Sequence, residues 1–388
     1  MHIEKITLTN FKNYDSQTLQ FGERLNAVVG LNGMGKTNLL DAIYYLCMCK
    51  SYFLPSDSDV ILRGADFLRL EGFFKKNSQT EKIVVKVQAR RKKIFERNDV
   101  PYPVLSEHIG FLPVVMMTPD DTELVKEGSE ARRRFLDNTL SQLDNVYLTH
   151  LIFYNRILDQ RNSLLKKYAN TLAETFVEDG QNSDLENLLS IYEKQMLPSA
   201  RYIFQKRKQF ILEFEPIFNA IYQNISDSRE SVKIVYESPI EKMIVQNEMN
   251  ETLGINFWLA SREKDRILQR TTVGIHRDDL GFEMGGKSVK KFGSQGQLKS
   301  FVVAIKLAQY EILRGVKTEP PILLLDDIFD KLDEQRVKNL LQLILNQSFG
   351  QVFITDTHEG RIKEIFESSS LDFKIFPIDN EAMEVKSK

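Results

Sequence analysis

The spacing of hydrophobic and polar residues changes twice along the chain. The first third consists of short runs rich in β-branched residues, such as HIEKITLTNF and RLNAVVG, and of an alternating stretch with a basic turn, EKIVVKVQARRKKIFERNDV. Short runs of this kind predict strands, and the alternating stretch predicts a hairpin. From about residue 120 to residue 250 the apolar residues recur at helical spacing, and Pro198 is expected to kink or divide the second long helix. Strands and loops then return, and helices alternate with strands from about residue 297 to residue 377.

This order of elements predicts an α/β fold with an inserted helical lobe. A chain of 388 residues with 42% hydrophobic content is long enough for a large core and for two or three domains. Its two cysteines, Cys47 and Cys49, follow the first glycine-rich turn, and we expect both to be reduced core or boundary residues without a metal or redox role.

No part of the sequence resembles a membrane or secretion signal. The apolar runs fall well short of the roughly 18 residues that a membrane helix needs. The N-terminal stretch MHIEKITLTNFKNY lacks a basic region followed by an apolar one. We therefore expect a cytoplasmic protein without a membrane partner.

Overall charge gives no indication of a nucleic-acid partner. The 52 Lys and Arg residues are balanced by 54 Asp and Glu residues, which leaves a net charge of -2. Positive charge gathers in short clusters, namely ARRKK (89–93), ARRR (131–134), LLKKY (164–168) and QKRKQ (205–209). Each cluster alone is more typical of a solvated surface than of a binding site.

The stretch GLNGMGKT, residues 30–37, lies between an apolar run and a helical pattern. Gly30, Gly35, Lys36 and Thr37 fit the pattern G-x-x-x-x-G-K-[ST] of a phosphate-binding loop, in the strand, loop and helix context that it needs. Glycines let successive backbone N–H groups point at an anion, and the N-terminus of the next helix adds positive charge. We expect Lys36 to contact the β- and γ-phosphates of a nucleotide and Thr37 to ligate Mg²⁺. A plain glycine-rich connector is the alternative interpretation.

A second motif, PPILLLDDIFDKLD at residues 320–333, supplies carboxylates. Its apolar run predicts a buried parallel strand, and Asp326 and Asp327 stand at the carboxyl end, where α/β sheets bind ligands. Asp326 is the candidate for holding Mg²⁺, and Asp327 is the candidate for orienting or deprotonating a water molecule. The same pair could instead cap the next helix.

A third motif, FGSQGQLKSFVVAIKLAQYEIL at residues 292–313, is a serine-glycine turn before a long predicted helix. Ser294 and the N–H groups of Gly296 and Gln297 offer a second helix N-terminus to an anion. One phosphate site in one chain rarely needs two such cradles. We therefore expect two chains to face head to tail, so that the turn of each closes on the γ-phosphate held by the other. An ordinary N-capped helix is the alternative.

Together the three motifs resemble those of the ABC and SMC class of ATPase heads. Over nearly the whole length, the order of segments is similar to the RecF family of bacterial DNA repair and replication proteins. The further segments that carry this resemblance are ITLTNFKNY, TPDDTELVKEGSEARRRFLD, YNRILDQRNSLLK and GIHRDDL. The resemblance implies an ABC-type ATPase head built from residues 1–120 and 252–388, with a helical lobe over residues 121–251 and no long coiled coil.

The resemblance also implies roles for individual residues. The nucleotide loop would comprise Gly30, Leu31, Asn32, Gly33, Met34, Gly35, Lys36, Thr37 and Asn38. Residues 10–14 would lie near the adenine, and Ser294, Gly296 and Gln297 would act on the nucleotide of the partner chain. The chain departs from the class after its last central strand, where Asp356 follows the threonine and His358 comes two residues later. Which of these two senses the γ-phosphate stays open.

For function, the resemblance implies an ATP-dependent DNA-binding protein of recombinational repair, replication restart and the SOS response. It would dimerise around two nucleotides and hydrolyse ATP weakly, with stimulation by DNA. Its expected partners are duplex DNA or single/double-strand junctions, RecR with RecO, and indirectly the RecA recombinase, which it would help to load at gaps. The candidate DNA-contact residues are Arg90, Arg91, Lys92 and Lys93 of the ARRKK hairpin and Lys206, Arg207 and Lys208 of the helical lobe.

Two other classes of function stay open. A transporter motor usually keeps the phosphate loop and the signature turn much closer in sequence than Lys36 and Ser294 are here. A nucleotide-gated binding module without useful hydrolysis is the other alternative, because Asp327 is one methylene shorter than the glutamate of many ABC ATPases.

Overall fold

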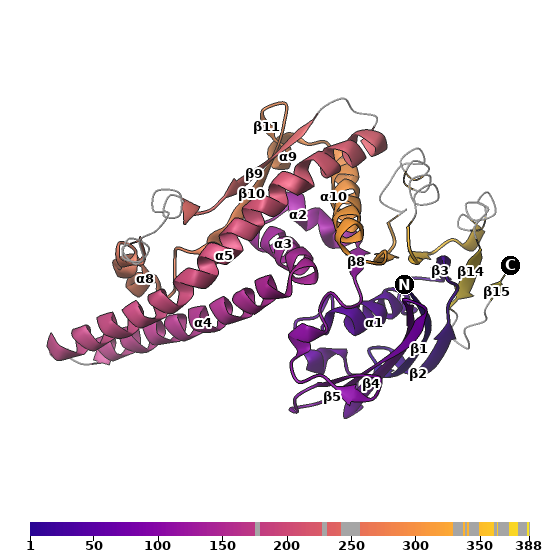
Figure 1. Ribbon diagram of the computed structural model, residues 1–388, viewed down its shortest axis with the longest axis horizontal. Helices are drawn as coiled ribbons and strands as arrows, with labels where there is room; N and C mark the ends of the chain where they lie inside the picture. The colour runs from indigo at the N-terminus through magenta and orange to yellow at the C-terminus, as the bar shows by residue number, and fades with distance from the viewer. Residues whose placement is uncertain are drawn as a thin grey trace. The chain divides into compact units, whose positions relative to one another are not determined.

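The computed structural model describes residues 1–174, 179–226, 231–241, 257–328, 337, 340, 349–360, 363, 372–378 and 386–387. The chain divides into two compact units, each made of more than one segment. Unit 1 comprises Met1–Thr122, Ile217–Ser231 and Gly293–Lys388, and unit 2 comprises Glu123–Pro216 and Val232–Phe292 (Figure 1).

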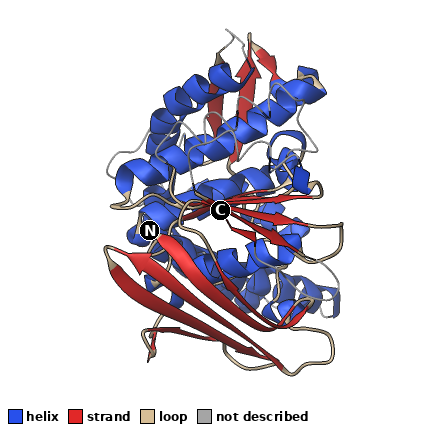
Figure 2. Ribbon diagram, turned by 90° about the vertical axis from the view of Figure 1, so that its right-hand side faces the viewer, coloured by secondary structure: helices blue, strands red, loops and turns tan. Residues whose placement is uncertain are grey.

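Unit 1 contains two six-stranded sheets, whose strands are drawn in red in Figure 2. The first sheet is antiparallel throughout, in the order β2-β1-β4-β5-β6-β7. Its strands are β1 (His2–Phe11), β2 (Tyr14–Gln20), β4 (Phe67–Lys76), β5 (Gln79–Gln88), β6 (Ile94–Arg97) and β7 (Val100–Pro101). The pairing of β5 with β6 confirms the hairpin predicted around the ARRKK turn.

The second sheet has the order β15-β14-β3-β13-β12-β8, and its pairs are parallel except for β14 with β15. Its strands are β3 (Leu25–Val29), β8 (Val114–Met117), β12 (Ile322–Leu325), β13 (Val352–Asp356), β14 (Phe373–Pro377) and β15 (Lys386–Ser387). Strands β3 and β12 are buried along their whole length, as expected for central strands of a parallel sheet. The buried strand predicted before Asp326 is thus confirmed.

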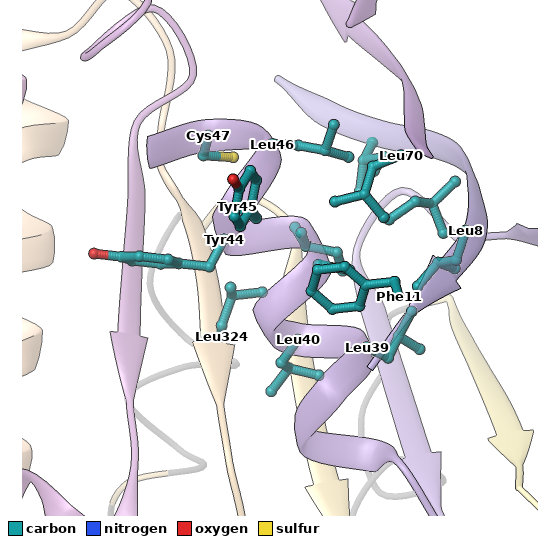
Figure 3. Packing of buried hydrophobic residues seen from close by; sticks show 14 of the residues in the cluster. Leu8, Phe11, Leu39, Leu40, Tyr44, Tyr45, Leu46, Cys47, Leu70 and Leu324 are labelled. Atoms are coloured by element: carbon teal, nitrogen blue, oxygen red, sulfur yellow. The ribbon is translucent and has the colours of Figure 1, made fainter. Parts of the chain in front are cut away.

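The main core of unit 1 surrounds helix α1 (Lys36–Met48). Figure 3 shows side chains of α1 among Leu8 and Leu70 of the antiparallel sheet and Leu324 of the parallel sheet. Burying one leucine side chain stabilises a fold by about 2 kcal/mol. Because α1 is held in this core, the loop at its N-terminus starts from a fixed position.

Unit 1 also contains helix α10 (Gln295–Val316) and the last part of helix α5 (Asp179–Ser226). Phe218 and Tyr222 of α5 pack against Phe301 of α10. The 3₁₀ helices of this unit are η1 (Asp57–Val60), η2 (Leu105–Glu107) and η3 (Pro119–Thr122). No helix in the described ranges combines the length and hydropathy that crossing a membrane requires.

Unit 2 combines helices with a small antiparallel sheet of order β11-β10-β9. Its helices include α2 (Glu123–Lys126), α3 (Ser129–Leu143), α4 (Asn145–Glu174), most of α5, α8 (Arg262–Leu268), η4 (Ile275–Arg277) and α9 (Val289–Phe292). Its strands are β9 (Val232–Glu237), β10 (Asp279–Met284) and β11 (Lys287–Ser288). Helix α5 continues through Pro198 and Pro216, so of the kink or division expected at Pro198 the division does not occur.

The units differ from the expected domains of residues 1–120, 121–251 and 252–388 at the later boundaries. Residues 217–231 belong to unit 1, whereas the segment that ends at Phe292 belongs to unit 2. Strand pairing explains the second difference, because β10 pairs with β9 over Val232–Glu237. A buried ion pair of 2.8 Å between Arg161 on α4 and Asp265 on α8 joins the same segments.

The two cysteines are free and buried, which confirms their place in the core. Cys47 lies within α1, and Cys49 follows the last residue of that helix. Burial raises the pKa of both thiols, that of Cys49 to about 12. Both therefore stay protonated at neutral pH.

Candidate nucleotide-binding site

The glycine-rich loop joins β3 to α1 at the carboxyl edge of the parallel sheet. Gly33 and Gly35 have positive φ angles of 84° and 103°, which residues with a Cβ rarely adopt. A Cβ on Gly35 would also lie 2.5 Å from Asn13 Nδ2. The loop therefore needs glycine at both positions, as expected where backbone approaches an anion.

Lys36 is the first residue of α1, and its ammonium group points back into the loop. Its Nζ donates hydrogen bonds to Gly30 O at 2.8 Å, to Leu31 O at 3.2 Å and to Asn32 Oδ1 at 3.4 Å. Lys36 is only 4% exposed. These acceptors are neutral oxygens, and an ionised phosphate oxygen is a stronger partner for an ammonium group. The structure thus places Lys36 where a phosphate in the loop would meet it.

Thr37 contacts Asp326 across 289 residues of sequence. The Thr37 hydroxyl lies 3.0 Å from Oδ1 and 2.9 Å from Oδ2 of Asp326, and the Thr355 hydroxyl donates to Oδ1 at 2.8 Å. Burial raises the pKa of the Asp326 carboxyl to about 6, and the hydroxyl hydrogen bonds and Lys36 oppose this rise only in part. The carboxylate is therefore buried against neutral hydroxyl groups, close to the first turn of α1.

Asp327 follows with a left-handed backbone at a φ of 42°, a conformation that aspartate tolerates better than most residues. Its N–H donates to Thr355 Oγ1 at 2.8 Å, and that hydroxyl lies 3.4 Å from Asp327 Oδ1. Asp326 is fully buried, whereas Asp327 is only half-buried. Of the two adjacent carboxylates, Asp327 is thus the one that water can reach.

The start of β2 and the turn before it support the loop through side chains that the sequence did not single out for this role. Tyr14 donates its hydroxyl hydrogen bond to Gly35 O at 3.0 Å. Asn13 Nδ2 donates to Met34 O at 3.3 Å, and Asn38 Nδ2 donates to Asn13 Oδ1 at 2.7 Å. Only the resemblance pointed to residues 10–14, because no local pattern marks a turn that holds a distant loop.

Thr355 is another residue of the site for which no local sequence pattern predicted a role. A polar residue at the carboxyl end of a buried strand was the signal that could have found it, because ligands bind at that edge of a parallel sheet. The same edge carries Asp356, whose backbone O accepts the Gly30 N–H at 3.2 Å and whose Oδ1 accepts the His358 N–H at 2.7 Å. Asp356 is 2% exposed, whereas His358 is exposed.

Ser294 is the N-cap of α10, and it forms a capping box with Gln297. The Gln297 N–H donates to Ser294 Oγ at 3.2 Å, and the Ser294 N–H donates to Gln297 Oε1 at 2.8 Å. Ser294 is exposed, and Gly296 and Gln297 are partly exposed. This geometry is that of an N-capped helix, and it presents the serine and the following backbone at the surface.

The four candidate DNA-contact residues of the hairpin differ in whether their side chains are exposed or already paired. Arg90, Arg91 and Lys92 are exposed in the turn between β5 and β6. Lys93 is committed elsewhere, because its Nζ donates to Cys49 O at 2.7 Å and lies 2.8 Å from Asp57 Oδ2.

The lobe cluster requires a correction at Arg207. Its side chain is 1% exposed and forms ion pairs with Asp137 at 2.7 Å and Asp278 at 2.6 Å. Arg207 therefore belongs to the core of unit 2 and cannot contact DNA, because helical spacing turns it inward between two surface lysines. Those lysines are themselves paired, Lys206 with Asp144 at 3.0 Å and Lys208 with Glu241 at 2.9 Å.

The residues present fit a nucleotide with Mg²⁺. Within the part of the chain that the structure describes, no group of three or more His, Cys, Asp or Glu residues forms a metal site made of protein alone. Mg²⁺ is commonly held by one or two side-chain oxygens together with phosphate and water oxygens. The Thr37 hydroxyl and the Asp326 carboxylate supply such oxygens, and the glycine loop with Lys36 suits the phosphates.

The sheet, the glycine loop and the paired aspartates define an ABC-type ATPase head. The crystal structure of an SMC head bound to the C-terminal winged-helix domain of ScpA shares this fold, with a TM-score of 0.55 at 17% identity over 100% of this chain and 98% of that one. A family model described as the RecF/RecN/SMC N-terminal domain matches residues 2–377.

More similar proteins narrow the class to one family. A protein of Flavobacterium johnsoniae named DNA replication and repair protein RecF is 45% identical over 376 residues, which cover 97% of this chain and 99% of the relative. Its namesake in Bacteroides fragilis is 41% identical over 384 residues, which cover 99% and 98%. A solved structure of the recombination mediator protein RecF with ATP in the RecFOR pathway has a TM-score of 0.85 at 28% identity, and covers 100% of this chain and 98% of that one. The chain therefore belongs to the RecF family.

Proposed function

We propose that this protein is an ATP-dependent DNA-binding protein of replication and recombinational repair, which dimerises around ATP and hydrolyses it slowly. The contact of Thr37 with Asp326 carries the nucleotide part of this proposal. It joins the start of α1 to the end of β12, and both lie beside the ammonium group of Lys36. Full-length similarity to proteins named for DNA replication and repair supports the DNA part.

In this proposal each residue of the site has one task. The glycine loop donates backbone N–H groups to the phosphates, and Lys36 exchanges its neutral acceptors for the β- and γ-phosphate oxygens. Thr37 and Asp326 would hold Mg²⁺, which supplies positive charge beside the phosphate oxygens. Asp327, the more accessible carboxylate, orients the attacking water or accepts its proton.

The signature turn acts on a second chain. Ser294 and the N–H groups that follow it reach the γ-phosphate held by the partner, which completes two sites in a head-to-tail dimer. The surface position of the capped turn supports this role, because a helix N-terminus favours an anion. Of Asp356 and His358, Asp356 is the better placed candidate for sensing whether the γ-phosphate is present, because its backbone O accepts the N–H of Gly30 in the loop.

Membership of the family supports the remaining roles of this proposal. RecR with RecO would bind the ATP-bound dimer on DNA, and RecA would be loaded at gaps through them. The pathway in which the structurally similar recombination mediator works supports this assignment. The short side chain of Asp327 favours, as second candidate, a nucleotide-gated binding module whose hydrolysis is too slow to matter.

Light scattering of the full chain tests the proposal. With Mg²⁺ and ATP the parent should double its mass, and Ser294→Arg should stay monomeric while it still binds ATP. Ser300→Ala, on the buried side of α10, is the matched control on the same helix, and it should dimerise like the parent. A parent that stays monomeric at all protein and nucleotide concentrations would refute the head-to-tail dimer.

A further inference from the structure

One motif of the sequence takes no part in the nucleotide site. GIHRDDL, residues 274–280, lies in unit 2, and both of its aspartates have structural partners. Asp278 pairs with Arg207, and Asp279 pairs with Arg132 at 2.6 Å. Arg277, next to them, is exposed and donates to Thr271 O at 3.1 Å. Both carboxylates of the motif are thus paired with arginines of the protein, whereas the guanidinium group of Arg277 is exposed.

Arg133 of α3 lies at the same turn. Its Nη1 donates to Asp278 O at 2.7 Å, which is a backbone oxygen without formal charge. Within the described ranges, Arg133 and Arg277 both donate to carbonyl groups, and the ion pairs of this turn are made by Arg132 and Arg207. Four arginines therefore meet three carboxylates here, those of Asp137, Asp278 and Asp279.

The charges of Arg133 and Arg277 affect the pKa values of the same group of side chains. Burial lowers the pKa of Arg133, and the nearby charges of Arg207 and Arg277 lower it further, against the two aspartates. Burial also lowers the pKa of His276 to about 4, and both Arg277 and Arg133 contribute to this lowering. His276 is neutral at physiological pH, between the Tyr154 hydroxyl at 2.9 Å and Thr271 O at 3.0 Å. An anion that bound here would relieve repulsion between cations.

We propose that Arg133 and Arg277 form a phosphate-binding pair that contacts the DNA backbone, which rests on the DNA binding proposed above. A guanidinium group matches the geometry of phosphate and stays charged even when it is half-buried, as Arg133 is. The nucleotide residues all lie in unit 1, where the loop and Lys36 already serve the phosphates of ATP. A second phosphate-binding pair in unit 2 therefore suits a different ligand, a phosphodiester.

Fluorescence anisotropy with labelled duplex DNA, Mg²⁺ and ATP tests the pair in the full chain over a series of salt concentrations. The double variant Arg133→Gln/Arg277→Gln should weaken DNA binding by at least about tenfold. It should also flatten the plot of log affinity against log salt by about 2 per chain engaged. Arg134→Gln is the matched control, since Arg134 is exposed on the same helix but pairs with Glu130 at 3.2 Å, and it should change affinity less than about twofold.

Two further variants separate charge from folding. Arg277→Gln alone alters an exposed side chain and should lose part of the affinity with an unchanged melting temperature. Arg133→Lys keeps the charge and should retain more affinity than Arg133→Gln. Full DNA affinity in the double variant, or an equal loss in Arg134→Gln, would overturn the pair. Loss of affinity for a fluorescent ATP analogue with unchanged DNA binding would assign the pair to a nucleotide phosphate instead. A parent that fails to bind DNA with ATP would refute the proposed function itself.

Discussion

The two units bury charge in different ways. In unit 2, Arg207 lies between Asp137 and Asp278, and its guanidinium also contacts Tyr147 Oη at 3.1 Å and Ile275 O at 2.8 Å. In unit 1, the Asp326 carboxylate is as deeply buried, but the hydrogen bonds to it come from the hydroxyls of threonines. Burial raises the pKa of both Asp278 and Asp326, and a direct guanidinium contact opposes this rise only at Asp278.

This difference distinguishes an ion-pair network that stabilises the fold from a site that binds a ligand. A buried charge with a complete set of partners fixes the fold, and breaking it is costly. A buried carboxylate that meets neutral donors costs stability in the ligand-free protein, and it gains its full partner only with a cation. Burial of an ionised group is therefore a weak sign of function, and the identity of its partners is the stronger one.

The largest expected effect on stability comes from the ion pairs of Arg207 with Asp137 and Asp278 in unit 2. Arg207→Met should lower the free energy of unfolding by about 3–5 kcal/mol, because it leaves the buried Asp278 without its cation and removes the partner of the partly exposed Asp137. Urea unfolding followed by circular dichroism measures this. Lys206→Gln is the matched neighbour, and it should cost less than about 1 kcal/mol since its ion pair with Asp144 is exposed. If Arg207→Met loses no more stability than Lys206→Gln, the buried ion pairs of Arg207 do not fix the fold of unit 2.

The two adjacent aspartates of unit 1 should separate in function. Asp327→Asn should keep ATP binding and lower the hydrolysis rate by about a hundredfold, because an amide cannot accept the proton of the attacking water. Phosphate release under saturating ATP measures the rate, and the ATP-bound dimer should accumulate. If Asp327→Asn hydrolyses ATP as fast as the parent, another residue positions the water.

Asp326→Asn should stabilise the protein without Mg²⁺ by about 3 kcal/mol at pH 7.5, because it removes a buried negative charge. The carboxyl has its pKa raised from 3.8 to about 6, so the folded state binds a proton more tightly than the unfolded state. The cost of Asp326 is therefore fully present above pH 6, fades as pH falls toward 3.8, and is absent below.

The gain of Asp326→Asn over the parent should follow the same course in thermal melts between pH 4 and 7.5. Thr355→Val, which removes one hydroxyl donor, serves as control and should destabilise the parent instead, because it takes a hydrogen bond from the carboxylate. Equal stability of parent and Asp326→Asn across this pH range would show that the carboxylate is not strained by burial.

The smallest effect concerns the exposed part of the hairpin. Arg90→Gln/Arg91→Gln should leave folding unchanged and flatten the salt dependence of DNA binding by about 2 per chain engaged, since each neutralised phosphate contributes about 0.9. Lys93→Gln should not flatten it, because Lys93 is already paired with Asp57. A flatter salt dependence in Lys93→Gln but not in Arg90→Gln/Arg91→Gln would place the DNA elsewhere on the sheet.

The sequence predicted the parts of the fold that local pattern determines. The buried strand before Asp326, the loop that starts at Gly30 and the β5–β6 hairpin all follow from residue spacing, because burial and turn chemistry are local properties. Arg207 was misplaced because a basic triplet on a helix reads as surface, and only the fold brings Asp137 and Asp278 to it.

Long-range support of the site was also beyond the sequence. Thr355 reaches Asp326 only because β13 pairs with β12, and Asn13 reaches Met34 only because the first sheet packs around α1. Strand order in a parallel sheet depends on crossover connections rather than on local pattern. The unit boundary at Phe292 was missed for a similar reason, since β10 joins unit 2 by pairing with a strand far back in the chain.

Calorimetric titration of Mg²⁺ and ATP into the parent and into Lys36→Met tests whether the glycine loop binds the nucleotide. The parent should bind one nucleotide per chain, and Lys36→Met should bind at least about a hundredfold more weakly, because it loses the charge held in the loop. Both proteins should melt at similar temperatures without nucleotide, so that the loss reflects the site and not the fold. Equal affinity in the two proteins would contradict the assignment of the loop.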